Sequence, residues 1–89
     1  MWYTELKKIR VAIGMQAKEL AEKVGKSATY ISRIESGAII NTSFELVSSI
    51  ARVIAESDEI KSGRVDLSEY NSDFSKLVLS YRYETMKDV

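Results

Sequence analysis

Apolar residues recur at intervals of three and four along most of the chain, a spacing typical of amphipathic α-helices. There is no proline, and the glycines fall between the apolar stripes, where helices commonly end. The pattern predicts helices over residues 3–13, 17–24 and 28–36, and a fourth that begins near residue 42. The residues expected on their inward faces are Leu6, Ile9, Ile13, Leu20, Ala21, Val24, Ile31, Ile34, Phe44, Val47, Ile50, Ala51 and Ile54. We therefore expect an all-α protein.

The segment between the second and third helices carries strong local signals. Gly25 follows directly after Val24, at the place where a left-handed residue turns the chain. Ser27 is a good N-cap for the third helix, whereas Gln16 is a mediocre one for the second. Residues 16–37 are therefore expected to form two short helices joined by a tight turn.

The fourth helix has a marked beginning and an unmarked end. Thr42 and Glu45 match the capping-box pattern, so the helix is expected to start at that point. No helix-breaking residue follows Ala55 directly. The helix either ends near Ser57 or continues towards Gly63, and the pattern leaves both open.

The last third of the chain shows an apolar seam. A helix that begins near Asp66 and runs to about Lys87 aligns five large apolar residues at spacings of three and four, as in a heptad repeat. The seam consists of Leu67, Tyr70, Phe74, Leu77 and Tyr81, and Val78 widens it. A lone helix of this kind is not stable in water, so it must pack on its own chain, on a second copy or on another protein. We favour self-association, because the core of so short a chain is marginal.

Composition argues against most enzymatic and metal chemistry. The 89 residues include no cysteine and no histidine, which removes disulfides, the commonest metal ligand and the commonest general base. No paired carboxylates stand out, so we expect no enzyme activity, no metal and no cofactor. No apolar run approaches the ~20 residues of a membrane span, and the first residues do not resemble a cleavable signal. We expect a cytoplasmic protein without membrane contact.

Charge is balanced overall but divided unevenly. Residues 1–56 carry eight basic and six acidic side chains, a net charge of +2, whereas residues 57–89 carry five and seven, a net charge of −2. This mild asymmetry favours two parts with different roles. We expect a front module over 1–56, followed over 57–89 by a linker and a C-terminal helix that acts as a dimerisation element.

The front module resembles the helix-turn-helix domain of the lambda-repressor and Cro (XRE) family. The resemblance covers residues 6–54 and is centred on the sequence QAKELAEKVGKSATYISRIESG at residues 16–37. The positions that agree in register are Leu6, Arg10, Gly14, Leu20, Ala21, Val24, Gly25, Ser27, Ile31, Ile34, Glu35 and Gly37. The resemblance implies a lambda-repressor-like DNA-binding domain of four to five helices, here with an additional C-terminal helix.

The resemblance also implies which residues carry the function. Arg10 and Glu35 would form a partly buried ion pair that ties the first helix to the third. The surface facing double-stranded DNA would consist of Gln16, Ala17, Lys26, Ser27, Ala28, Thr29, Tyr30, Ser32 and Arg33, with Asn41 in the following loop. Chemistry supports this assignment most strongly for Arg33, because a guanidinium group can donate two hydrogen bonds to guanine O6 and N7.

Two features depart from the family pattern. Family members often carry glutamine at the position of Ala17, and basic residues in the loop that here reads Ala38-Ile39-Ile40-Asn41. Both departures reduce the number of expected phosphate contacts. The DNA affinity should therefore depend less steeply on salt concentration.

Two functions are consistent with these observations. The first is a sequence-specific transcriptional regulator, a homodimeric repressor that reads a palindromic operator through residues 28–36. The alternative is a protein-interaction module, such as an antitoxin or anti-repressor, that engages a protein partner through its C-terminal helix. Neither hypothesis requires a small-molecule effector.

Overall fold

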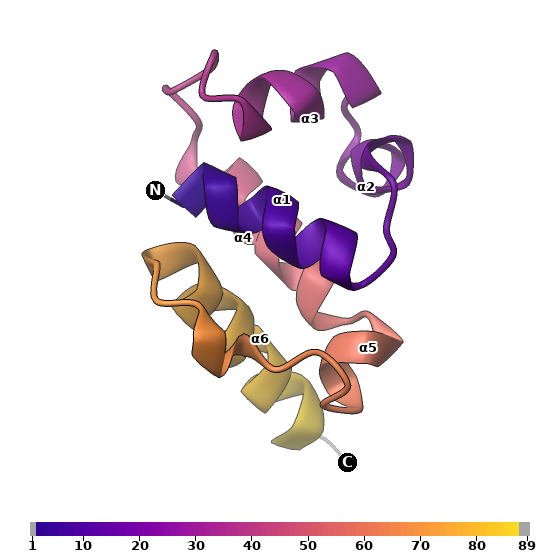
Figure 1. Cartoon of the computed structure of the whole chain (residues 1–89). Helices are drawn as coiled ribbons and strands as arrows, with labels where there is room; N and C mark the ends of the chain where they lie inside the picture. Colours follow the sequence, from indigo (N-terminus) through magenta and orange to yellow (C-terminus); the bar gives the residue numbers. More distant parts are fainter. Residues whose placement is uncertain (1, 88–89) are drawn as a thin grey trace.

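The computed structural model describes residues 2–87, and within that range it is entirely helical (Figure 1). Four helices make up the front of the chain, and a short helix, a single 3₁₀ turn and a long helix follow. In chain order the elements are α1 (Trp2–Ala12), α2 (Ala17–Val24), α3 (Ala28–Glu35), α4 (Phe44–Ala55), α5 (Asp58–Lys61), η1 (Leu67–Glu69) and α6 (Asp73–Lys87). The all-α prediction is confirmed.

The first three helices agree with the sequence prediction to within one residue at each end. Leu6 and Ile9 on α1, Leu20 on α2, and Ile31 and Ile34 on α3 are completely buried. The inward faces of these helices were therefore predicted correctly, and together they form the upper part of the hydrophobic core.

The start of α4 differs from the prediction. Ser43, not Thr42, is the N-cap, and its hydroxyl accepts a hydrogen bond from the N–H of Leu46 at 3.2 Å. Leu46 is buried, whereas Phe44 is 73% exposed, so the inward placement of Phe44 was wrong. Phe44 lies in the first turn of the helix, where it lines a groove together with residues of α1 and α6 instead of entering the core.

The expected long C-terminal helix is divided into two elements. The Asp66 carboxylate accepts a hydrogen bond from the Ser68 N–H at 2.9 Å and closes the short η1 turn. Tyr70 is then extended, with φ −104° and ψ 145°. The Ser72 hydroxyl accepts from the Ser75 N–H at 3.2 Å, and α6 begins at Asp73. These local polar contacts override the heptad spacing, so the continuous seam does not form.

Helix α6 packs along α4 and α1 of the same chain. Phe74 and Val78 are at most 1% exposed, and Leu67 is 3% exposed. These three residues cannot contact a second copy without leaving the core, so their assignment to a dimer interface was wrong. The other seam residues, Tyr70, Leu77 and Tyr81, are partly buried against the same core. The segment after residue 57 is therefore integrated into the fold of the front module.

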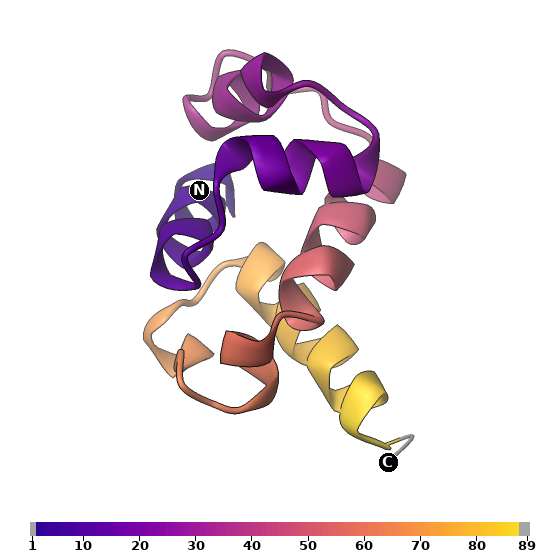
Figure 2. The ribbon, with the colours of Figure 1, turned by 90° about the vertical axis from the view of Figure 1, so that its right-hand side faces the viewer.

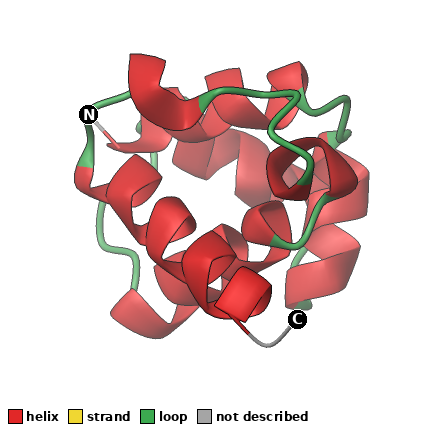
Figure 3. Ribbon diagram, turned by 90° about the horizontal axis from the view of Figure 1, so that it is seen from below, coloured by secondary structure: helices red, strands yellow, loops and turns green. Residues whose placement is uncertain are grey.

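Two polar contacts also hold α6 in place. The Glu5 carboxylate on α1 accepts a hydrogen bond from the Ser72 N–H at 3.3 Å, at the start of α6. Near the other end of α6, the Arg82 Nε donates to the Ile60 carbonyl of α5 at 2.8 Å. Figure 2 shows α5 and α6 below α1 and α2, with α4 running from the level of α2 down towards α5, and Figure 3 shows the helices from below.

The molecule is elongated, with principal extents of 36, 25 and 23 Å. Helix α3 lies at one end and the C-terminal part of α6 at the other (Figures 1 and 2). None of the described helices has the length and apolar character needed to cross a membrane. This arrangement leaves the outer side of α3 uncovered.

Candidate nucleic-acid interface

Helices α2 and α3 are joined by a turn that local sequence specifies. Gly25 has φ 72° and ψ 33°, a left-handed conformation, and its N–H points back to the carbonyls of Ala21 and Glu22. The Lys26 N–H donates to the Ala21 carbonyl at 2.9 Å. These bonds satisfy the last carbonyls of α2 and redirect the chain into α3.

The beginning of α3 is fixed by Ser27. Its hydroxyl accepts a hydrogen bond from the Tyr30 N–H at 3.1 Å, which satisfies one of the free donors of the first turn. The Tyr30 ring is half-buried against the core, and the Lys26 ammonium group lies 5.4 Å from its centroid. The N-cap prediction for Ser27 is confirmed.

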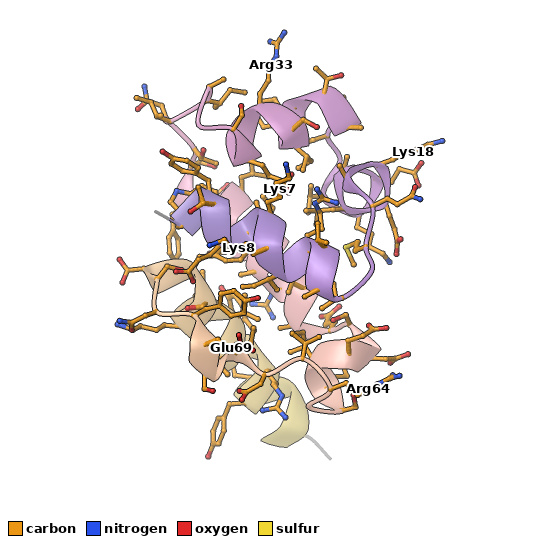
Figure 4. All side chains as sticks on the ribbon, viewed as in Figure 1. Lys7, Lys8, Lys18, Arg33, Arg64 and Glu69 are labelled. Carbon is orange, nitrogen blue, oxygen red and sulfur yellow. The ribbon has the colours of Figure 1, made fainter. Side chains whose placement is uncertain are left out.

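The two faces of α3 differ sharply. Ile31 and Ile34 are completely buried, whereas Thr29, Ser32 and Arg33 are exposed. Figure 4 shows Arg33 projecting from α3 away from the body of the molecule. The inward isoleucines therefore fix the rotation of the helix and keep its polar face outward.

An ion pair holds α3 against α1. Arg10 Nε lies 2.6 Å from Glu35 Oε2, and Arg10 Nη2 lies 2.9 Å from Glu35 Oε1. Arg10 Nη1 also donates to the Met15 carbonyl at 2.8 Å, in the loop before α2. The side chains are only 11% and 4% exposed. The predicted pair is confirmed, and the bond to Met15 extends it to the start of α2.

The other residues predicted to face DNA lie on or beside the same end of the molecule. Gln16, Lys26, Ser27 and Asn41 are exposed, and Ala17 and Ala28 are half-buried. Lys18, which was not among the predicted contacts, is exposed in the first turn of α2 but projects sideways rather than along the direction of Arg33 (Figure 4). The predicted set therefore combines exposed and half-buried residues and carries only two positive charges, those of Lys26 and Arg33.

The loop after α3 is held close to α1. Gly37 has φ 83°, and a Cβ atom at this position would lie 3.1 Å from the Tyr3 ring. Ile39 packs against the core, whereas Ile40 is 73% exposed. This loop therefore contributes apolar surface beside α3. It lacks the basic residues that would contact phosphates.

The exposed face of α3 presents hydrogen-bonding groups. Among residues 2–87, no group of three or more acidic side chains is placed to hold a metal ion. The arrangement instead consists of hydrogen-bond donors and acceptors on a rigid helix. A polar helix of this kind fits the major groove of B-DNA, which is wide enough to admit an α-helix.

Comparison with known proteins gives one match. A family model described as helix-turn-helix matches residues 6–59, which include α2, the turn and α3. No curated protein and no solved structure shows significant similarity to the chain.

Proposed function

Because the chain belongs to the lambda-repressor/Cro-like helix-turn-helix family of DNA-binding regulators, we propose that it is a dimeric repressor that reads a palindromic operator through α3. The observation that carries the proposal is the exposed face of α3, with Arg33 directed away from a helix whose opposite face is completely buried. A side chain held in this way can meet base edges without a costly rearrangement.

The residues of this surface have different proposed roles. Arg33 donates to guanine O6 and N7, and the methyl groups of Ala28 and Thr29 touch thymine methyls. Gln16, Lys26, Ser27, Tyr30, Ser32 and Asn41 contribute polar contacts to phosphates and base edges. Ala17 adds no hydrogen bond, so the domain is positioned on the backbone by fewer groups than is usual for its family.

A single domain with one strong base contact binds weakly and with little specificity. Two copies related by a two-fold axis read two half-sites about one helical turn, roughly 34 Å, apart. Repression follows when such a dimer occupies an operator that overlaps a promoter. We propose this steric mechanism because it requires nothing of the protein beyond occupation of the operator.

One observation supports a second function. The loop after α3 places exposed Ile40 beside the reading surface and contains no basic residue. An apolar surface of this kind suits a protein partner better than a phosphate backbone. The second candidate is therefore a protein-interaction module of the antitoxin or anti-repressor kind.

Selection from a random duplex library, followed by sequencing, tests the proposal. A recovered palindrome with half-sites about one turn apart would support both DNA reading and two-fold symmetry. The salt dependence of binding to the recovered sequence would then report the number of phosphate contacts. Absence of measurable DNA binding at ~50 mM salt, where phosphate contacts are strong, would contradict the proposal and favour the protein-interaction module.

A further inference from the structure

A groove lies where the first turns of α1, α4 and α6 meet, on the flank of the molecule that is on the left in Figure 1. Its volume of about 770 Å³ is in the range of pockets that hold small organic molecules. It is lined by residues of these three helices and of the segments just before α4 and α6. The groove is therefore separate from the outer face of α3.

Aromatic and aliphatic side chains form the walls of the groove. Trp2 of α1, Phe44 of α4 and Phe74 of α6 line it, together with Val47 and Leu77. Trp2 is half-buried and Phe44 is 73% exposed, so part of the aromatic surface is accessible from solvent. Aromatic rings attract cations that lie over their faces, and tryptophan does so most strongly. The walls therefore suit an apolar molecule that also carries a positive charge.

The charged side chains of the groove are acidic. Glu5 on α1 and Asp73 at the start of α6 line it, and no lysine or arginine among the described residues does. Lys8 and Lys76, about one helical turn further along the same two helices, are exposed and lie outside the lining. Within residues 2–84, neither acid forms an ion pair. Two carboxylates without a basic partner favour an occupant that supplies the positive charge.

Two polar groups of the groove are available to such an occupant. Asp73 is exposed, and nothing in the described part of the chain donates a hydrogen bond to its carboxylate. Thr42 also lines the groove, and its buried hydroxyl oxygen has no hydrogen-bond partner among the described residues. An unpartnered buried hydroxyl is costly, and a rotation of the Thr42 side chain towards an occupant would remove that cost. An ammonium group matches these acceptors, because it carries up to three N–H donors and no acceptor.

We propose that the groove is a binding site for a small organic amine, in its ammonium form, with an aromatic or aliphatic body. The apolar body lies against Trp2, Phe44 and Leu77, and the ammonium group faces the carboxylates of Glu5 and Asp73. The same two carboxylates repel anionic molecules. Because α3 does not line the groove, the proposal does not depend on DNA reading.

Three probes that share one apolar body test the role of charge. Phenethylamine, phenethyl alcohol and hydrocinnamate are a cation, a neutral molecule and an anion at neutral pH. Trp2 lines the groove and is the single tryptophan of the chain, so its fluorescence reports occupation directly. In titrations of the full chain at low salt, we expect phenethylamine to bind about tenfold more tightly than phenethyl alcohol. Hydrocinnamate should bind more weakly than the alcohol.

Two variants test the residues that carry the proposal. Asp73→Asn removes one of the two charges, and Phe44→Ala removes one aromatic wall. Both side chains are exposed, so the fold should be unchanged, as circular dichroism can verify. Each variant should weaken phenethylamine binding about two- to fivefold. Asp73→Asn should leave the affinity for phenethyl alcohol unchanged, because that contact involves no charge.

Two matched variants serve as controls. Asp58 is the first residue of α5, as Asp73 is of α6, and Tyr83 is an aromatic residue that is 69% exposed. Neither Asp58 nor Tyr83 lines the groove. Asp58→Asn and Tyr83→Ala should therefore bind phenethylamine as tightly as the wild type.

Three results would overturn the proposal. The first is equal affinity of the wild type for phenethylamine and phenethyl alcohol, because the groove would then select only for apolar area. The second is the absence of a Trp2 response to phenethylamine up to about 10 mM, at which a site with a Kd of roughly 1 mM is nearly full. The third is equal weakening of amine binding by Asp73→Asn and Asp58→Asn. No DNA is present in these titrations, so each result is independent of whether α3 reads an operator.

Discussion

Arg33 is the side chain on which sequence reading by α3 depends most. It is exposed, it projects away from the protein, and it is the only basic residue within α3. The other exposed residues of α3, Thr29 and Ser32, are uncharged. Its contribution to DNA binding can therefore be measured with little interference from neighbouring charges.

We predict that Arg33→Ala weakens binding to the selected operator by about 1–3 kcal/mol per half-site and relaxes the base preference at one position. Competition binding against operators altered at each position measures both effects. Arg64→Ala is the control, because Arg64 is exposed at the opposite end of the molecule (Figure 4). Equal losses for the two variants would show that Arg33 acts only through its charge.

The pair between Arg10 and Glu35 is a second feature at the scale of single residues. Both guanidinium–carboxylate contacts are buried, so removing one partner leaves a charge without its counterpart. We predict that Arg10→Met or Glu35→Gln alone lowers the free energy of unfolding by about 3–5 kcal/mol. The double variant should cost clearly less than the sum of the single variants. Urea denaturation of the four proteins measures this coupling, and additive losses would contradict it.

At the scale of elements, the turns on either side of α3 depend on glycine for different reasons. A Cβ atom at Gly25 would meet nothing within 4 Å, whereas one at Gly37 would lie 3.1 Å from the Tyr3 ring. Both residues have a positive φ, which costs other residues about 1–2 kcal/mol.

We predict that Gly25→Ala lowers stability by about 1–2 kcal/mol and that Gly37→Ala lowers it by more, because the second change adds a steric conflict to the same backbone cost. Gly25→Asn, which tolerates the left-handed region, should cost less than Gly25→Ala. Thermal denaturation of the three variants ranks them. A Gly37→Ala variant as stable as Gly25→Ala would show that the Tyr3 ring moves aside freely.

The contact between α1 and α6 should make stability depend on pH. Partial burial acts to raise the pKa of Glu5, but hydrogen bonds from Ser72 and Asn71 outweigh it and lower the pKa below its usual value. A carboxylate with a lowered pKa stabilises the fold above its unfolded pKa, and this contribution is lost as pH falls through the folded pKa. We predict that Glu5→Gln is less stable than the wild type at pH 7 and that the difference shrinks towards pH 3. A difference that stays constant in urea denaturation at the two pH values would contradict this explanation.

At the scale of the whole molecule, the C-terminal helix is part of the core. Phe74 is 1% exposed, and its ring centroid lies 5.6 Å from that of Trp2, the single tryptophan of the chain. Tryptophan fluorescence therefore reports directly on whether α6 is docked.

We predict that Phe74→Ala lowers the free energy of unfolding by about 3–5 kcal/mol, through lost burial and the cavity that remains. The loss of α6 packing should change the Trp2 emission. This change should occur at the same denaturant concentration as the loss of the helical circular dichroism signal. Tyr83→Ala, at an exposed position of the same helix, should change stability by no more than about 0.5 kcal/mol. A stable, fully folded Phe74→Ala monomer would instead indicate that this residue serves an intermolecular contact.

Sequence alone determined the parts of the molecule that depend on local chemistry. The ends of α2 and α3, the left-handed Gly25 and the N-cap at Ser27 follow from contacts between residues only a few positions apart. The outward face of α3 follows as well, because Ile31 and Ile34 define the buried side. The pair of Arg10 and Glu35 is separated by 25 positions, and only the family resemblance indicated it.

Only the tertiary structure decided how the remaining apolar residues are covered. Periodicity shows that a face is apolar but not what packs against it, so the seam from Leu67 to Tyr81 was compatible with the self-association that we favoured and also with packing on its own chain. The fold places Phe74 and Val78 in the intrachain core and leaves Phe44 exposed beside a groove. The physical reason is that burial depends on where neighbouring helices begin and end, which is a property of the assembled molecule.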